Sequence, residues 1–109
     1  MNFIQGSIKT INTNSLGNIT TIRGYTFAEC SYLKSITIPS PVATIEEGAF
    51  YNCHSLENVT VLNPTPPTLG DEAFYATSTA LVIYVPASSV SAYQTAWSEY
   101  SSKIQALPN

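Results

Sequence analysis

The apolar residues between positions 27 and 61 recur at a constant interval. Two rows of five apolar residues are related by a shift of 23 positions, namely Phe27, Cys30, Leu33, Ile36 and Ile38, and then Phe50, Cys53, Leu56, Val59 and Val61. A period of about 20 to 50 residues is typical of a solenoid, in which each repeat is one supersecondary unit. Because one unit cannot bury its apolar side alone, successive units stack on one another. The pattern therefore predicts a solenoid.

Each predicted coil contains a strand and a tight return. Ile36–Ile38 and Val59–Val61 alternate apolar and polar positions and are rich in β-branched residues, which indicates short strands with one buried face. In the return segment Phe50, Cys53 and Leu56 are spaced three apart, as in a helical or 3₁₀ turn. Equivalent strands of neighbouring coils are expected to pair in parallel, about 4.8 Å apart.

The chain is predicted to be a single domain, residues 1–109, in which the repeat is clear between residues 19 and 86. That stretch holds about three repeats, and the step from Phe50 to Phe74 is one position longer than the step from Phe27 to Phe50. The extra residue lies within Asn63–Pro67. Residues 1–18 fit the period poorly, since one period before Ile36 the chain has the polar residue Thr13. We expect this segment to be a degenerate first repeat that contributes one or two strands.

Residues 87–109 are predicted to form a C-terminal cap, because the period stops after Pro86. Ser88 and Ser89 are suited to the N-cap of a helix. The residues that recur at helical spacing after them are Val90, Tyr93, Trp97 and Tyr100. This pattern predicts an amphipathic helix of about three turns, followed by a final strand near Ile104. Such an aromatic element would cover the open apolar end and the unpaired edge of the last coil.

The polar surface is predicted to consist mainly of hydroxyl groups. Charged residues make up 10% of the chain, far below the roughly 25% of an average soluble protein, whereas there are 13 Ser and 13 Thr. The net charge is −3 and the four basic residues are scattered singly, which argues against binding to nucleic acid or to an anionic membrane surface. No apolar run approaches the ~18 residues of a membrane span, so we expect no membrane insertion.

Three segments of the second coil carry a repeat signature. Leu33–Pro39, Val42–Ile45 and Gly48–Leu56 follow the order L-x-x-I-x-I-P, V-x-x-I and G-x-x-A-F-x-x-C-x-x-L, with variable gaps. This signature resembles the leucine-rich repeat of the BspA-like, Treponema pallidum type. The tail, Pro66–Leu69 together with Ile83–Val90, resembles the C-terminal cap of such proteins from gut and oral bacteria.

The resemblance implies an α/β fold, a short leucine-rich-repeat solenoid with parallel strands, short helical or 3₁₀ turns and a C-terminal capping helix. It also implies a non-enzymatic protein-interaction or adhesion module, similar to bacterial adhesins that bind host extracellular-matrix proteins. Met1–Ile4 opens no signal peptide, so we expect an extracellular or cell-surface location as part of a longer exported chain. Two sites depart from the family pattern, since Tyr25–Phe27 replaces the G-x-A-F run and Thr77 replaces cysteine.

Two other functions and one further mode of association are open at this point. The chain could be the structural C-terminal terminator of a longer solenoid. It could instead bind glycans, with Tyr25, Tyr32 or Tyr84 as stacking platforms for sugar rings. End-to-end self-association through the N-terminal edge is also compatible with stacked repeats.

The predicted partner-binding face follows from the alternation within the strands. If Ile36 and Ile38 point inward, the residues beside them point outward, and the repeat stacks the outward residues of successive coils in rows. The candidate residues are Ser35, Thr37, Asn58, Thr60, Val82 and Tyr84. Repeat proteins usually bind through such extended faces, but a solvated ladder without a partner would show the same pattern.

No group of residues predicts catalysis, a cofactor or a metal site. His54 is the only histidine and has neither convergent ligands nor a plausible triad. The acidic pairs Glu46–Glu47 and Asp71–Glu72 both precede an Ala-Phe and should share one turn edge, but they lack the ligand number of a Ca²⁺ cage. Cys30 and Cys53 occupy the same coil position within disulfide reach. Because stacked side chains point the same way, we expect reduced, buried thiols.

Overall fold

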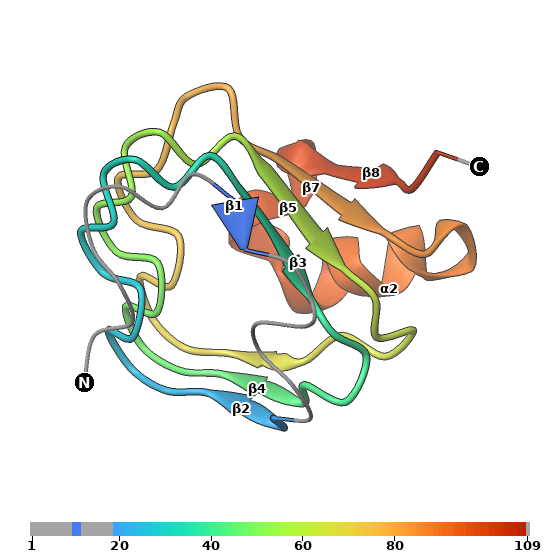
Figure 1. Ribbon diagram of the computed structural model, residues 1–109. Coiled ribbons are helices and arrows are strands. Elements are labelled where there is room, and N and C mark those ends of the chain that lie inside the picture. Colours follow the sequence, from blue (N-terminus) through green and yellow to red (C-terminus); the bar gives the residue numbers. More distant parts are fainter. Residues whose placement is uncertain (1–9, 12–18, 109) are drawn as a thin grey trace.

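The computed structural model describes residues 10–11 and 19–108 of the chain. In these residues, successive coils add strands to two parallel sheets (Figure 1). The five-stranded sheet contains, in this order, β1 (Thr10–Ile11), β3 (Ser35–Ile38), β5 (Asn58–Val61), β7 (Val82–Val85) and β8 (Ile104–Ala106). The three-stranded sheet contains β2 (Thr21–Ile22), β4 (Thr44–Ile45) and β6 (Thr68–Leu69). The predicted parallel solenoid is therefore confirmed.

The spacing of the repeat sets the register between strands. Ile36 of β3 lies opposite Val59 of β5, one period further along the chain. Val59 in turn lies opposite Ile83 of β7, a step that is one position longer, and in the other sheet the step from Thr44 to Thr68 is longer by the same amount. The extra residue is therefore accommodated in the connection between β5 and β6, as the sequence predicts.

The first coil differs from its predicted register. Thr10 lies opposite Ser35 and Ile11 lies opposite Ile36, so the step from β1 to β3 is two positions longer than the step from β3 to β5. The additional residues are accommodated between β1 and β3. Because the longer connection leaves the pairing of the two strands intact, a prediction from a constant period places the first strand two positions too late. The rest of residues 1–18, where the edge for end-to-end self-association is predicted, lies outside the described residues.

The return segments form the third side of each coil, and an alternating pattern of backbone hydrogen bonds holds them together. The N–H groups of Phe27 and Phe50 donate to the carbonyls of Ala49 and Ala73 in the next coil, at 2.9 and 2.8 Å. Every second N–H group instead bonds within its own coil and closes a turn there. The N–H of Cys53, for example, donates to the Phe50 carbonyl. These bonds from residue i to residue i−3 close separate turns, and among the described residues 3₁₀ helix occurs only in the cap, so the return segments do not form the predicted helical or 3₁₀ turns.

Left-handed backbone positions divide each return segment into separate turns. Among the described residues, positive φ angles occur at Tyr25 (59°), Glu29 (62°), Gly48 (64°), Asn52 (63°), Glu72 (57°) and Ala76 (59°). The first such position is Tyr25, Gly48 or Glu72 in successive coils, and the second lies four positions further on. Glycine adopts this region without steric cost, and the coil with Gly48 is the one that carries the repeat signature.

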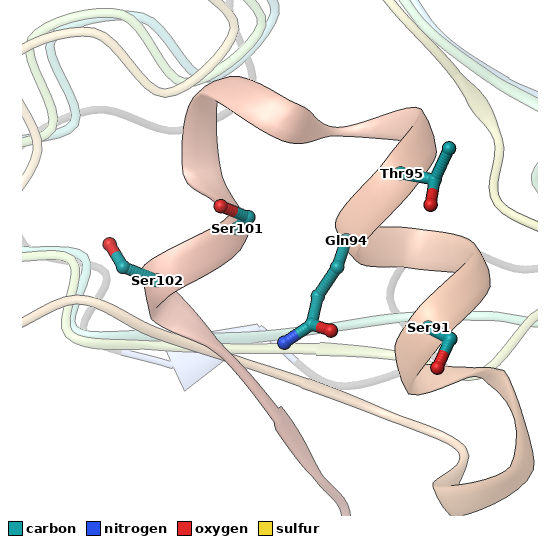
Figure 2. A pocket seen from close by; sticks show the side chains of 5 residues that line it. All are labelled: Ser91, Gln94, Thr95, Ser101 and Ser102. Carbon is teal, nitrogen blue, oxygen red and sulfur yellow. The ribbon is translucent and has the colours of Figure 1, made fainter.

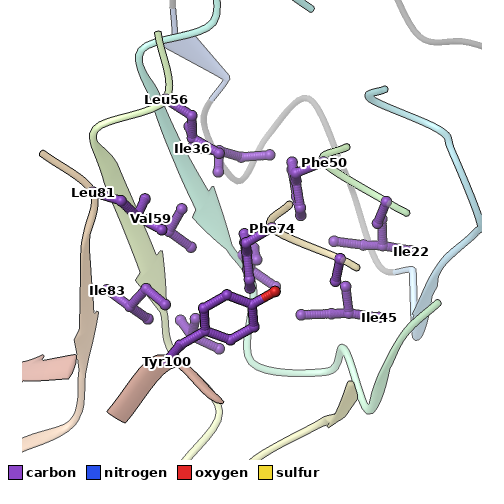
Figure 3. Close-up of a cluster of buried hydrophobic side chains, with 14 of the residues drawn as sticks. Ile22, Ile36, Ile45, Phe50, Leu56, Val59, Phe74, Leu81, Ile83 and Tyr100 are labelled. Atoms are coloured by element: carbon purple, nitrogen blue, oxygen red, sulfur yellow. The ribbon is translucent and has the colours of Figure 1, made fainter. Parts of the chain in front are cut away.

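Phenylalanine rings stack through the centre of the solenoid. Phe27, Phe50 and Phe74 occupy equivalent positions, and their ring centroids lie 5.3 Å apart at each step, with interplanar angles of 7° and 4°. The rings of Trp97 and Tyr100 pack on the last of them, with centroids 6.0 and 5.4 Å from that of Phe74. Figure 3 shows Phe50, Phe74 and Tyr100 among the isoleucines, leucines and valines of the same buried cluster. The cap therefore covers the apolar end of the ring stack, as predicted.

The C-terminal cap contains less α-helix than the sequence predicts. It consists of the 3₁₀ helix η1 (Ala87–Ser89), the α-helix α2 (Val90–Ala96), the 3₁₀ helix η2 (Ser98–Lys103) and β8. The expected helix of three turns ends after Ala96, because Trp97 (φ −112°, ψ 52°) leaves the helical region, and Tyr100 belongs to η2. No helix in the described part of the chain is long and apolar enough to cross a membrane.

Three side chains of the cap donate hydrogen bonds to the loop that follows β5. The pairs are Ser89 Oγ to the Pro64 carbonyl (2.7 Å), Tyr93 OH to the Asn63 carbonyl (2.5 Å) and Trp97 Nε1 to the Pro67 carbonyl (2.9 Å). Prolines offer a carbonyl acceptor but no N–H donor, so hydroxyl and indole donors suit this loop. The hydroxyl of Ser89 is thus engaged with the loop and makes no capping bond to α2, although Ser89 is its N-cap residue.

Candidate interaction surfaces

The exposed face of the five-stranded sheet carries two straight rows of side chains. One row is Ser35, Asn58 and Val82, and the other is Thr37, Thr60 and Tyr84. Each of these residues alternates along its strand with a fully buried residue, while the six themselves are partly or well exposed. The predicted register and outward orientation are thereby confirmed, whereas the role of this face in binding stays a prediction.

Strand β8 lengthens this face beyond the repeats. Gln105 lies opposite Tyr84 and is exposed, while Ile104 lies opposite Ile83 and is buried. Sequence reasoning missed Gln105, because the period stops at Pro86 and assigns no register to the last strand. The alternation of a buried and an exposed residue at Ile104 and Gln105 is the signal that could have found it.

A second ladder of hydroxyl side chains lies on the three-stranded sheet. Thr21 lies opposite Thr44, and Thr44 lies opposite Thr68. Each of them precedes an isoleucine or leucine that belongs to the core or packs against it. This threonine ladder has the same chemistry as the pair Thr37 and Thr60, but it lies on a different sheet.

A row of tyrosines lies along the return segments, and we call this surface the turn edge. It comprises residues 23–29, 46–52 and 71–76. Tyr25 and Tyr75 are 45% and 53% exposed, and Tyr51 stands between them. The ring centroid of Tyr51 lies 6.1 Å from that of Tyr25, edge to face, and 5.4 Å from that of Tyr75, stacked. Of these three tyrosines, the sequence analysis selected only Tyr25. Tyr51 and Tyr75 are separated by the same number of residues as Phe50 and Phe74, and this shared spacing is a repeat signal that could have identified them.

The turn edge is also acidic. It holds five of the seven acidic residues of the chain and one of the four basic residues. Tyr25 OH donates to Glu47 Oε2 over 3.4 Å, and Glu46 Oε1 accepts from the Gly24 N–H at 3.0 Å. The negative charge of Glu47 is the main cause that raises the pKa of the Tyr25 hydroxyl, and partial desolvation and Glu72 add to it. Across the described residues, no three His, Cys, Asp or Glu side chains are grouped as ligands for a metal ion.

The repeat signature extends over almost the whole chain. Residues 2–107 match the family described as BspA type leucine rich repeat region (6 copies). The chain belongs to this family. The match confirms the resemblance deduced from the repeat, and the family consists of repeat modules of the protein-interaction or adhesion type. A comparison with curated proteins finds no match.

The three tyrosines considered for sugar stacking come from different elements of this BspA-type solenoid. Tyr84 belongs to β7, Tyr25 belongs to the turn edge, and Tyr32 lies in the turn that precedes β3, where it is 57% exposed. They do not occupy equivalent positions of successive coils. They therefore do not form one row, whereas Tyr25 and Tyr75 both pack on the ring of Tyr51.

Both cysteines of the BspA-type repeat are buried thiols. Cys53 Sγ donates to the Phe27 carbonyl at 2.9 Å, and burial raises the pKa of this thiol to about 12. Burial also raises the pKa of the Cys30 thiol. A thiol that stays protonated near neutral pH is a weak nucleophile, so these residues suit the core and not catalysis. His54 is exposed.

The third coil replaces the buried cysteine by a shifted turn. The repeat pattern places Thr77 at the cysteine position. In the structure the N–H of Leu81 donates to the carbonyl of Ser78, as the N–H of Leu56 does to that of Cys53. Ser78 therefore takes the backbone role of the cysteine, and neither Thr77 nor Ser78 is buried.

A hollow lies on the cap between α2 and η2 (Figure 2). It is lined by Ser91, Gln94, Thr95, Ser101 and Ser102. Every lining side chain ends in a hydroxyl or an amide, so the hollow can donate and accept hydrogen bonds but offers no group for acid–base chemistry near neutral pH.

Proposed function

We propose that this chain is a protein-interaction module of a bacterial cell-surface or secreted protein, and that it binds its partner through the exposed face of the five-stranded sheet. The observation that carries the proposal is the pair of straight rows, in which six outward side chains are held in register by buried neighbours. Membership in a family of the protein-interaction and adhesion type supports the same function. A host extracellular-matrix protein is the class of partner that fits this setting.

The rows suit a polar, uncharged contact with one aromatic anchor. Their serine, threonine and asparagine side chains offer both donors and acceptors of hydrogen bonds. Tyr84 adds a large amphipathic ring, and tyrosine is among the residues that dominate the free energy of binding at interfaces. Because the side chains stand on paired strands, ordering them costs little conformational entropy on binding. The face is small, so we expect a weak affinity that further copies would raise through avidity.

Charge placed in the middle of this face tests the proposal. A variant with Thr37→Lys and Thr60→Lys should lose binding to a panel of immobilised matrix proteins in biolayer interferometry, with its Tm unchanged. The matched control carries Thr21→Lys and Thr44→Lys, because these two threonines form the same stacked pair on the other sheet. Equal binding by the two variants would contradict the proposal.

A second candidate function is that of a structural terminator for a longer solenoid. The cap favours it, because Trp97 and Tyr100 cover the last phenylalanine ring and β8 adds a further strand to the sheet. A chain with this function alone would bind no member of the matrix panel, and deleting the cap from a longer repeat array would lower its Tm and solubility.

Glycan binding is the third candidate, and the exposure of Tyr25 and Tyr32 favours it. A glycan array should then show hits that disappear with Tyr25→Ala or Tyr32→Ala. An array without hits would exclude this function.

A further inference from the structure

The ring of Tyr25 lies flat against the next coil of the turn edge. A Cβ atom placed on Gly48 would lie 2.3 Å from Cε1 of Tyr25 and 2.7 Å from both Cδ1 and Cζ. Because it would be equally far from the two ring neighbours of Cε1 and only slightly farther than from Cε1 itself, it would lie directly above Cε1, over the plane of the ring. One face of the ring is therefore covered by the backbone at Gly48. The residue as a whole remains 45% exposed, so the rest of the ring is available to a partner.

Two carboxylates act on this ring, one through a hydrogen bond and one at longer range. Glu47 accepts the hydrogen bond of the Tyr25 hydroxyl, and Glu72 of the following coil is close enough to act on the same hydroxyl electrostatically. Both carboxylates are exposed. The ring is thus held in a region of negative potential, on the side of the molecule that carries most of its acidic residues.

Tyr25 and Glu72 occupy backbone positions that favour glycine. They have φ angles of 59° and 57°, and the equivalent residue between them in the stack is Gly48, at 64°. A side chain in this left-handed region destabilises the folded chain relative to glycine. An aromatic ring and a carboxylate are therefore kept where glycine would be the more stable choice, which motivates a search for a ligand.

We propose that the turn edge is a second interaction surface, and that it binds a basic segment of a polypeptide by placing an arginine or lysine side chain on Tyr25 beside Glu47, in the negative potential to which Glu72 adds. A cation is attracted both to the face of an aromatic ring and to carboxylates, so the two features of this surface favour the same ligand. A neutral sugar would gain from the ring but not from the negative potential. The charge of the surface thus selects a basic partner, and this surface lies apart from the rows of the five-stranded sheet.

A fluorescein-labelled peptide with four arginines separated by Gly-Ser pairs serves as the probe, and fluorescence anisotropy measures its binding to the full chain. The Tyr25→Gly variant should bind this peptide at least about five-fold more weakly and yet be no less stable, because it relieves the left-handed position. The control is Ala76→Gly, which relieves a left-handed position (φ 59°) without removing a ring or a charge and should bind as the unaltered chain does.

Charge and ligand class are tested separately. Glu47→Gln combined with Glu72→Gln should weaken binding and flatten its dependence on salt concentration, while a peptide with glutamine in place of arginine should not bind. Equal affinity of the unaltered chain and the Tyr25→Gly variant for the arginine peptide would overturn the proposal. Equal binding of the glutamine peptide, or Tyr25-dependent binding of neutral oligosaccharides in preference to the arginine peptide, would overturn it as well.

Discussion

The hydroxyl of Tyr93 donates a hydrogen bond to the backbone carbonyl of Asn63, over 2.5 Å and between residues far apart in the sequence. Asn63 is also held by its side chain, whose Nδ2 donates to the Val42 carbonyl and whose Oδ1 accepts from the Thr65 N–H, both at 2.9 Å. The loop after β5 thus connects the previous coil to the cap. Docking of the cap depends on this loop, which holds the extra residue of the third repeat.

Replacing Tyr93 by phenylalanine removes this bond and leaves the ring in place. We expect the free energy of unfolding to fall by about 1–2 kcal/mol, because the carbonyl of Asn63 loses its buried donor. Thermal unfolding followed by circular dichroism measures the effect, and Tyr75→Phe is the control because the residue is 53% exposed. Equal Tm values for the two variants would contradict a role of this bond in docking the cap.

The phenylalanine ladder should dominate the stability of the repeats. Phe50 is fully buried and stacks on a ring in each neighbouring coil, so Phe50→Ala should lower the free energy of unfolding by about 3–5 kcal/mol in urea titrations. Tyr51→Ala is the control, since Tyr51 is half-buried on the turn edge and should cost clearly less. A similar loss for both variants would show that the ladder is not the core of the coil.

Two glycines should respond differently to the same substitution. A Cβ atom on Gly70 would lie 2.3 Å from the Glu47 nitrogen and 2.6 Å from the Glu46 carbonyl carbon, and such backbone atoms cannot move aside without shifting the coil. On Gly24 it would lie 3.1 Å from the Glu47 carbonyl oxygen. We expect Gly70→Ala to destabilise the fold by about 2 kcal/mol or more and Gly24→Ala to have a smaller effect, measured by urea denaturation. The reverse order would contradict this close approach of the coils.

Stability should fall at alkaline pH because of the buried thiol of Cys53. Burial raises its pKa from 9.0 to about 12, so between these values the thiolate forms in the unfolded chain but not in the folded chain. The contribution of this thiol to the free energy of unfolding is therefore complete below about pH 9. As the pH rises from 9 toward 12, the free energy of unfolding falls by up to about 1.4 kcal/mol per pH unit because of this group.

Urea denaturation between pH 7 and 11 measures this slope. The Cys53→Ala variant should show a shallower decline above pH 9 than the unaltered chain, even though its stability at pH 7 is lower. Identical slopes would show that other groups control alkaline unfolding.

The outward rows of the candidate site could be deduced from sequence because they repeat a local pattern. Thr37 and Thr60 lie one period apart between buried β-branched residues, and stacked coils place such positions opposite one another. The tyrosines of the turn edge were not deduced as a row. The place of Tyr25 beside Tyr51 depends on a left-handed backbone position, which its residue type does not indicate.

The sequence by itself determined the coil, the register of β3 with β5 and the burial of the phenylalanine ladder, because each is a consequence of one unit repeated with the same apolar positions. Only the tertiary structure decided the longer offset of β1, the early end of α2 at Trp97 and the docking of the cap on the loop after β5. These features rest on contacts between unlike segments far apart in the chain. No period encodes such contacts, and their energetics override local helical and repeat preferences.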